Sequence, residues 1–158
     1  MKPSLRIAAV IVLVLAAGLF AGALTAQDVQ MPLADIQVKH FTQAEGLGKS
    51  PDFLNYFYNG LIQELPKTKV ATQVVGEEGS VPEAEAANAV VVEGTLIEVK
   101  STVIKAEISL YRLSDRKLVK TFTCAVMSKP SPLNKEKNVA ETAGRRTAYE
   151  IQKSLKKL

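Results

Sequence analysis

Apolar and polar side chains alternate most regularly in the segment from Val103 to Leu113. Alternation with a period of two is typical of a strand that is buried on one face only. Valine-rich Ala89–Lys100 precedes this segment and Leu118–Met127 follows it, with short polar turns between them. Together the three segments predict an antiparallel meander of two hairpins. The middle strand carries Ile104, Ala106, Ile108 and Leu110 on one face and Lys105, Glu107 and Ser109 on the other.

A pattern with helical spacing lies in the first half of the chain. Ser50, Pro51 and Asp52 provide an N-cap, a proline at the first helical position and an acidic residue in the first turn. The predicted helix runs to Leu65, and Pro66 ends it. Its apolar face consists of Leu54, Phe57, Tyr58, Leu61, Ile62 and Leu65.

Two further strands are predicted on either side of this helix. Ile36–Phe41 alternates apolar and polar residues before it, and Thr68–Val75 is rich in β-formers after it. Thr42–Lys49 is expected to be a loop, and the glutamate-rich stretch Gly76–Asn88 is expected to be a mobile surface loop.

A second helix is predicted at the carboxyl end. Asn138 followed by Glu141 is a capping signal, and a linker containing proline and lysine, Lys129–Lys137, precedes it. The apolar stripe of this helix begins with small residues, which would allow close approach to a sheet. The stripe consists of Ala140, Gly144, Thr147, Ala148, Ile151, Leu155 and Leu158.

The order of these elements predicts the fold class. A β-α-β unit comes first, three antiparallel strands follow, and a helix closes the chain. Because such crossovers are right-handed, the first two strands should be parallel. We therefore expect an α+β fold in which a mixed five-stranded sheet carries two helices on one face.

The amino-terminal residues have the three parts of an export signal. Lys2 and Arg6 form a basic start, Ile7–Leu24 has no charged or polar side chain, and small residues follow. Cleavage is expected after Ala26, with Ala23 as the second candidate. The organisation is then a signal peptide at 1–26, a leader at 27–35 and one α+β domain at 36–158. We expect a periplasmic or secreted protein, although an apolar run of this length could also stay uncleaved as a membrane anchor.

Composition narrows the range of functions. The signal segment holds two of the 20 basic and none of the 16 acidic residues, so its removal lowers the formal net charge from +4 to +2. A nucleic-acid partner is not expected, since such binding depends on a clustered basic surface. The single cysteine, Cys124, allows no intramolecular disulfide.

Two residues are candidates for chemistry by type. His40 is the only histidine, and a zinc site would need several further ligands, of which only Cys124 is at hand. A packed or solvated His40 is the favoured interpretation, with a general base as the alternative. Cys124 lies mid-strand between apolar residues and is expected to be buried and inert.

Three other patterns have ordinary explanations. Gly46–Ser50 resembles the end of a phosphate-binding loop, but Gln43 stands where that motif needs its first glycine, so a glycine loop leading to a serine cap is favoured. Arg145 and Arg146 could meet anionic lipid or glycan, or simply be solvated. Glu77, Glu78, Glu83 and Glu85 lack the spacing of a calcium loop. We assign no catalytic, cofactor-binding or metal-binding residue and expect no cofactor.

The segment Ala87–Glu98, with the sequence ANAVVVEGTLIE, is similar to a strand of small bacterial exported proteins of unknown function. Their following Tyr-x-Leu-x-Asp turn is matched by Tyr111–Asp115. The layout of residues 36–158 also resembles the amino-terminal domain of the Tol system's periplasmic protein and the curli-secretion lipoproteins. The chain departs from these families in lacking a lipobox cysteine and in having Asn88 where aspartate is usual. The resemblance implies envelope assembly or partner binding and transfers no catalytic residue.

The sequence thus favours an exported envelope protein that acts as a non-catalytic binding or assembly module, and not an enzyme. One alternative is a hydrolase that acts on an envelope substrate through His40 or the acidic loop. Another is a subunit of a secreted complex. A cleft that groups His40 with a carboxylate and a hydroxyl would favour the hydrolase. The expected partner is an envelope protein or an anionic lipid or glycan, with the membrane contacted only through an uncleaved signal.

Overall fold

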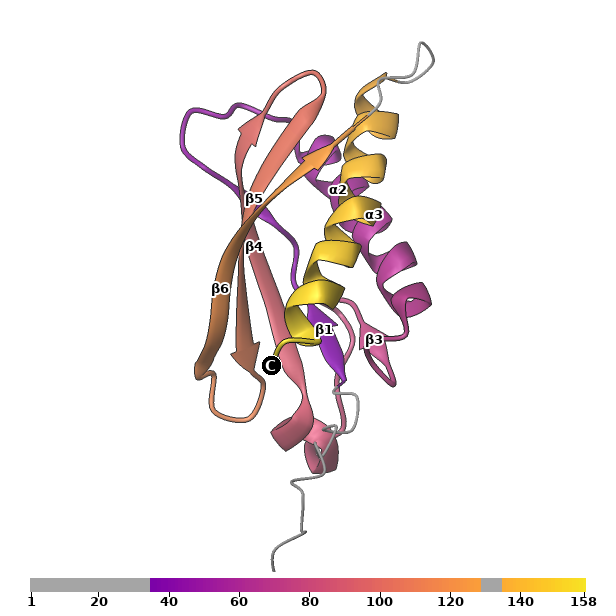
Figure 1. The fold of residues 1–158 in the computed structure, drawn as a ribbon, viewed down its shortest axis with the longest axis vertical. Coiled ribbons are helices and arrows are strands. Elements are labelled where there is room, and N and C mark those ends of the chain that lie inside the picture. The colour runs from indigo at the N-terminus through magenta and orange to yellow at the C-terminus, as the bar shows by residue number, and fades with distance from the viewer. Residues whose placement is uncertain (1–34, 129–134) are drawn as a thin grey trace, which may run out of the picture. The chain divides into compact units, whose positions relative to one another are not determined.

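The computed structural model describes residues 35–128 and 135–158, which contain one mixed six-stranded sheet and two long helices (Figure 1). The antiparallel meander comprises β4 (Val90–Val99), β5 (Val103–Arg112) and β6 (Leu118–Met127). All three strands lie where the alternation predicted them. On β5, Ile104, Ala106, Ile108 and Leu110 are buried as expected.

The two other predicted strands are shorter than expected, and an additional two-residue strand lies in the segment Thr42–Lys49, which was predicted to be a loop. β1 (Ile36–Val38) pairs in parallel with both β3 (Val74–Val75) and β4, so the predicted parallel pair is confirmed. The strand order is β3-β1-β4-β5-β6, and β2 (Thr42–Gln43) pairs with β4 beyond the end of β1.

The predicted bounds of the first two strands were wrong for local reasons. After β1 the chain turns so that Phe41 enters the core against Gly94, where an added Cβ would lie 2.3 Å from the Phe41 ring. Thr68 belongs not to a strand but to the 3-10 helix η1 (Leu65–Thr68), which begins directly before Pro66 and continues the chain in helical form. A second 3-10 helix, η2 (Glu83–Asn88), interrupts the predicted acidic loop.

The first long helix, α2 (Pro51–Glu64), begins where the sequence predicted. Ser50 is its N-cap, and its hydroxyl accepts a hydrogen bond of 3.1 Å from the backbone N–H of Phe53. Phe57, Tyr58 and Leu61 are buried as expected.

The second long helix, α3 (Lys135–Leu155), begins before the predicted cap. Asn138 lies inside the helix, so its assignment as N-cap was wrong; residues 129–134 of the expected linker lie outside the described part. The stripe from Ala140 to Ile151 is buried, and Leu155 is half-buried. Leu158 is 58% exposed because the helix ends at Leu155, so its place in the stripe was also wrong.

The small residues of α3 allow close contact with α2 as well as with the sheet. A Cβ on Gly144 would lie 2.0 Å from the carbonyl oxygen of Phe57, and one on Gly60 would lie 2.2 Å from that of Glu141. The two helix backbones therefore touch at this crossing, which the sequence had suggested only for a helix and the sheet.

Both helices pack on one face of the sheet, as predicted (Figure 1). The buried side chains of β4, β5 and both helices form one hydrophobic core. The opposite sheet face is covered by no helix of the described residues (Figure 1). None of the described helices combines the length and the hydropathy needed to cross a membrane.

Candidate functional site

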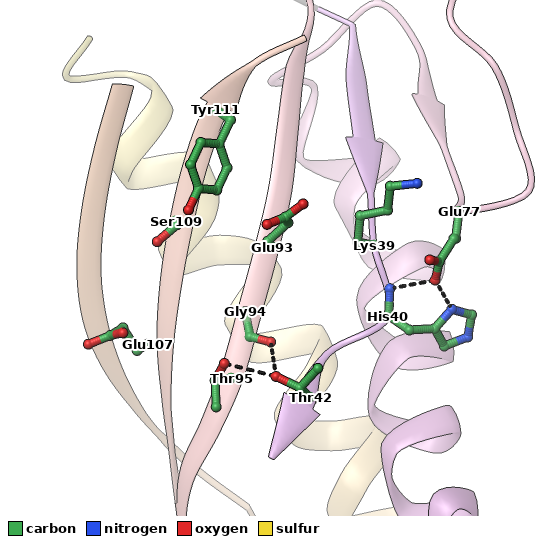
Figure 2. Close-up of a pocket in the computed structure, with 10 residues that line it drawn as sticks. All are labelled: Lys39, His40, Thr42, Glu77, Glu93, Gly94, Thr95, Glu107, Ser109 and Tyr111. Atoms are coloured by element: carbon green, nitrogen blue, oxygen red, sulfur yellow. Dashed lines mark hydrogen bonds and ion pairs between the residues drawn. The ribbon is translucent and has the colours of Figure 1, made fainter. Parts of the chain in front are cut away.

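A hollow of about 480 Å³ lies on the uncovered face of the sheet (Figure 2). Ten residues line it, from β2, β4, β5, the segment after β1 and the segment after β3. Nearly all of them are charged or carry a hydroxyl group. This polar lining follows from the strand alternation, because the positions between buried residues face outward.

Strand register brings the lining side chains together. Glu93 on β4 is directly opposite Ser109 on β5, and Thr95 is opposite Glu107. Parallel pairing sets Thr42 of β2 beside Thr95. Residues that face each other across neighbouring strands point to the same side of the sheet, so these five form the floor of the hollow.

The hydroxyl groups of the floor bond to one another or to the backbone. The hydroxyls of Thr42 and Thr95 lie 2.9 Å apart, and Thr42 also donates to the Gly94 carbonyl at 3.5 Å. The Ser109 hydroxyl lies 3.0 Å from that of Thr121 on β6.

His40 and Glu77 form the charged side of the hollow (Figure 2). One carboxylate oxygen of Glu77 accepts from the backbone N–H of His40 at 3.0 Å and lies 2.6 Å from its Nδ1. The His40 ring stacks on Tyr58, with 3.8 Å between ring centroids. The Tyr58 hydroxyl in turn accepts from the Glu77 backbone N–H at 2.9 Å. Three residues from separate elements thus hold one another in place.

Electrostatics fix the proton arrangement of this cluster. Hydrogen bonds from the backbone and then the ring of His40 lower the pKa of Glu77 below 4.5. Glu77 is therefore a carboxylate at neutral pH and can only accept, so the His40 proton sits on Nδ1. When the ring is neutral, Nε2 of His40 is then the nitrogen that can accept.

On the other side, Glu93 is neutralised by Arg116 from the β5–β6 turn. The guanidinium lies 2.5 Å from the Glu93 carboxylate and 5.1 Å from the centre of the Tyr111 ring. Arg116 has a positive φ of 57°, as is common in tight hairpin turns. Among the described residues, Lys39 and Glu107 make no ion pair.

The structure brings His40 together with the one acidic-loop residue Glu77 and separates the other candidates. Cys124 is buried, and burial raises the pKa of its thiol. Glu85 bonds to Asp35, and Arg145 pairs with Glu141 at 3.6 Å. In residues 35–128 and 135–158 no three histidine, cysteine or acidic side chains gather closely enough to hold a metal ion.

The phosphate-loop resemblance has a structural explanation. Gln43 clamps the loop by accepting from the backbone N–H of Lys49 at 2.8 Å and donating to its carbonyl at 2.9 Å. Gly46 and Gly48 both have positive φ, and Ser50 caps α2. The glycines thus shape the turn into the helix.

The sequence pattern did not identify seven residues of the hollow as site residues: Lys39, Thr42, Glu93, Thr95, Glu107, Ser109 and Tyr111. The outward positions of β5 had been identified as a polar face, and that was the available signal. Whether a polar face is covered depends on where the helices pack, which the local pattern does not contain.

A second surface feature is the outer edge of β6. In the part of the chain that the structure describes, no strand pairs with this edge. Leu118 and Met127, at the two ends of β6, are 51% and 64% exposed, and Val119 is also exposed.

Comparison with known proteins shows a shared fold. PelC from Paraburkholderia phytofirmans, solved as a dodecamer, is similar with a TM-score of 0.51 and 12% identity over 77% of this chain and 90% of that one. A single-residue variant of that PelC, also a dodecamer, has a TM-score of 0.50 and 13% identity, and the match covers 77% of this chain and 88% of that one. A DUF330 protein from Xanthomonas campestris has a TM-score of 0.49 and 12% identity, and the match covers 77% of this chain and 84% of that one. No family model and no curated protein sequence matches the chain, so neither the Tol nor the curli-secretion family is shown.

Proposed function

We propose that the chain is an exported, non-catalytic envelope module that assembles with further copies of itself through the outer edge of β6. The unpaired edge of this ten-residue strand carries the proposal. A long, regular edge strand is a template for pairing with another chain, and proteins that stay monomeric usually protect it.

The direction of the backbone groups supports pairing at this edge. The Ser128 N–H donates to the Thr102 carbonyl at 2.8 Å, on the β5 side. Because hydrogen-bonded and non-bonded pairs alternate along an antiparallel ladder, the N–H groups of Thr121, Thr123 and Ala125 face outward. The exposed apolar residues at the ends of β6 would be buried by a second strand.

Two further observations support an assembly in the envelope. PelC shares the fold and was solved as a dodecamer, so this architecture is compatible with many copies in contact. The signal-like segment at 1–26 supports export.

A proline substitution at an outward position tests the proposal. Thr123→Pro removes one outward N–H without removing a bond of the β5–β6 ladder, and edge strands tolerate proline at such positions. Thr123→Val keeps the N–H and favours the strand conformation, so it is the matched control.

Light scattering after size-exclusion chromatography measures the outcome. We expect oligomers for the unchanged chain and for Thr123→Val, and a folded monomer for Thr123→Pro. A chain that is monomeric at every concentration, or a Thr123→Pro variant that still assembles, would contradict the proposal.

The His40–Glu77 pair favours one second candidate, a hydrolase acting on an envelope substrate. The hollow groups His40 with a carboxylate and with hydroxyls, and a neutral imidazole ring can accept a proton at Nε2. The floor hydroxyls bond elsewhere, so a water molecule would be the nucleophile. Hydrolysis of an ester or amide substrate that His40→Gln abolishes would support this candidate. Equal rates for the two proteins would exclude it.

A further inference from the structure

The hollow has features of a built binding site, and it is separate from the β6 edge. His40 is held by Glu77 and Tyr58 although its side chain is 44% exposed. Ordering an exposed ring adds little to the core, whereas a ligand gains from a group that is already fixed. The volume of about 480 Å³ lies within the range of small-molecule sites, roughly 300–1,000 Å³.

The charges of the hollow are almost balanced. Glu77 is occupied by His40, and Glu93 by Arg116. Lys39 and Glu107 remain, one positive and one negative, without an ion pair among the described residues. Figure 2 shows them on opposite sides of the hollow, with Glu93 and Thr95 between them.

This arrangement specifies the chemistry of a ligand. A ligand that spans the hollow would donate hydrogen bonds to Glu107 and accept them from Lys39. Between these ends it meets hydroxyls, which both donate and accept. A sugar of one or two rings has groups that donate and accept hydrogen bonds along its whole length.

From these observations we infer that the hollow binds a neutral carbohydrate, with Glu107 as hydrogen-bond acceptor and Lys39 as donor at opposite ends. His40 Nε2 accepts a further hydroxyl at the rim. The inference does not depend on assembly through β6, and either can hold without the other.

The only histidine of the chain provides a direct probe, because its ring signals in an NMR spectrum need no assignment. Purified chain is titrated with maltose, cellobiose and diacetylchitobiose, and separately with glutamate and spermidine as charged probes. We expect a saturable shift of the His40 ring signals with at least one neutral disaccharide. The inference is overturned if none of the three shifts them at concentrations that fill a site with a Kd of about 1 mM. Binding of the charged probes alone overturns it as well.

Three variants connect the shift to the hollow. Glu107→Gln and Lys39→Gln should each weaken sugar binding about tenfold or more, the loss expected for a hydrogen bond to a charged group. Glu45→Gln is the matched control, because Glu45 is exposed and lies outside the hollow. The unfolding midpoint of each variant verifies its fold. Unchanged binding in both folded site variants would place the sugar elsewhere and overturn the inference.

Discussion

Neighbouring groups shift the pKa values of two carboxyl groups of this chain in opposite directions. Hydrogen bonds from Lys100 and then Lys105 lower the pKa of Glu98 to about 2. The pKa of Glu85 is instead raised, because its carboxyl group shares a hydrogen bond with Asp35. Asp35 is buried, and its Oδ2 has no hydrogen-bond partner in the described part of the chain. A lowered pKa stabilises the fold at high pH and a raised one at low pH, so the two sites have opposite pH dependence.

The Glu85 site predicts a pH-dependent stability. The pKa of Glu85 is raised above 4.5 in the folded state. The contribution of Glu85 to the free energy of unfolding is therefore fully present below its unfolded pKa and is lost as the pH rises through its folded pKa. Glu85→Gln can donate to Asp35 at any pH, so thermal unfolding midpoints of this variant should lack that loss. Glu83→Gln, an exposed neighbour in η2, should keep the profile of the unchanged chain. Parallel profiles for Glu85→Gln and the unchanged chain would contradict the assignment.

Cys124 predicts a simple contrast in reactivity. Burial, and then the charge of Glu150, raises the pKa of the thiol, so little reactive thiolate forms at neutral pH. We expect slow labelling by a thiol reagent in the native state and fast labelling in denaturant, followed by mass spectrometry. Fast labelling of the native protein would show that β6 and α3 open readily at this point.

The limit of sequence reasoning at this scale is visible in His40. Its partner Glu77 is 37 residues away, and the contact exists only because η1 and β3 return the chain beside β1. Local pattern identified both residues as candidates but contained no information that they meet.

At the scale of elements, prediction succeeded where one periodicity continues over many residues. The meander was predicted because each of its strands extends over ten residues with turn residues between them. β1, β2 and β3 have only two or three residues each. The bounds of β1 and β2 are set by pairing with β4, and those of β3 by pairing with β1. A strand that short has no periodicity of its own to recognise.

The crossing of α2 and α3 predicts an unusual effect of a glycine substitution. Gly→Ala in a helix ordinarily stabilises by about 1 kcal/mol. Gly144→Ala should instead destabilise by about 1–3 kcal/mol, because its Cβ would overlap the Phe57 carbonyl. Denaturant unfolding measures the difference. Arg146 is exposed on the same helix, so Arg146→Ala is the control, and its free energy of unfolding should stay within about 0.5 kcal/mol of that of the unchanged chain. A stabilised Gly144→Ala variant would mean that the helices lie further apart.

At the scale of the whole molecule, the two faces of the sheet have different roles. The helix-covered face supplies the core, which leaves the other face free for the polar hollow. The β6 edge lies at the end of the strand order and takes no part in lining the hollow. Assembly through β6 would therefore leave the hollow open, and a ring or stack of copies would present one hollow for each copy.

The proposed function includes export of the chain, which depends on residues 1–26. Cleavage after Ala23 would have small residues, Ala21 and Ala23, at both positions that the peptidase reads. Cleavage after Ala26 would have Leu24 at the first position and Ala26 at the second. Protein purified from the extracytoplasmic fraction should have the intact mass of a chain that begins at Gln27, or failing that at Leu24. A mass that retains Met1–Phe20 would instead indicate a membrane anchor.

Substitution of the small residues distinguishes cleavage by signal peptidase from trimming by another protease. Ala26→Tyr removes the expected site and should move the new amino terminus to Leu24, because a large side chain is not accepted directly before the cut. Ala23→Tyr alone should leave Gln27 as the first residue. The double variant should keep the whole segment and remain bound to the membrane through its apolar run. If the double variant still yields the same short chain, removal of the segment does not depend on these alanines, and export must be tested by fractionation alone.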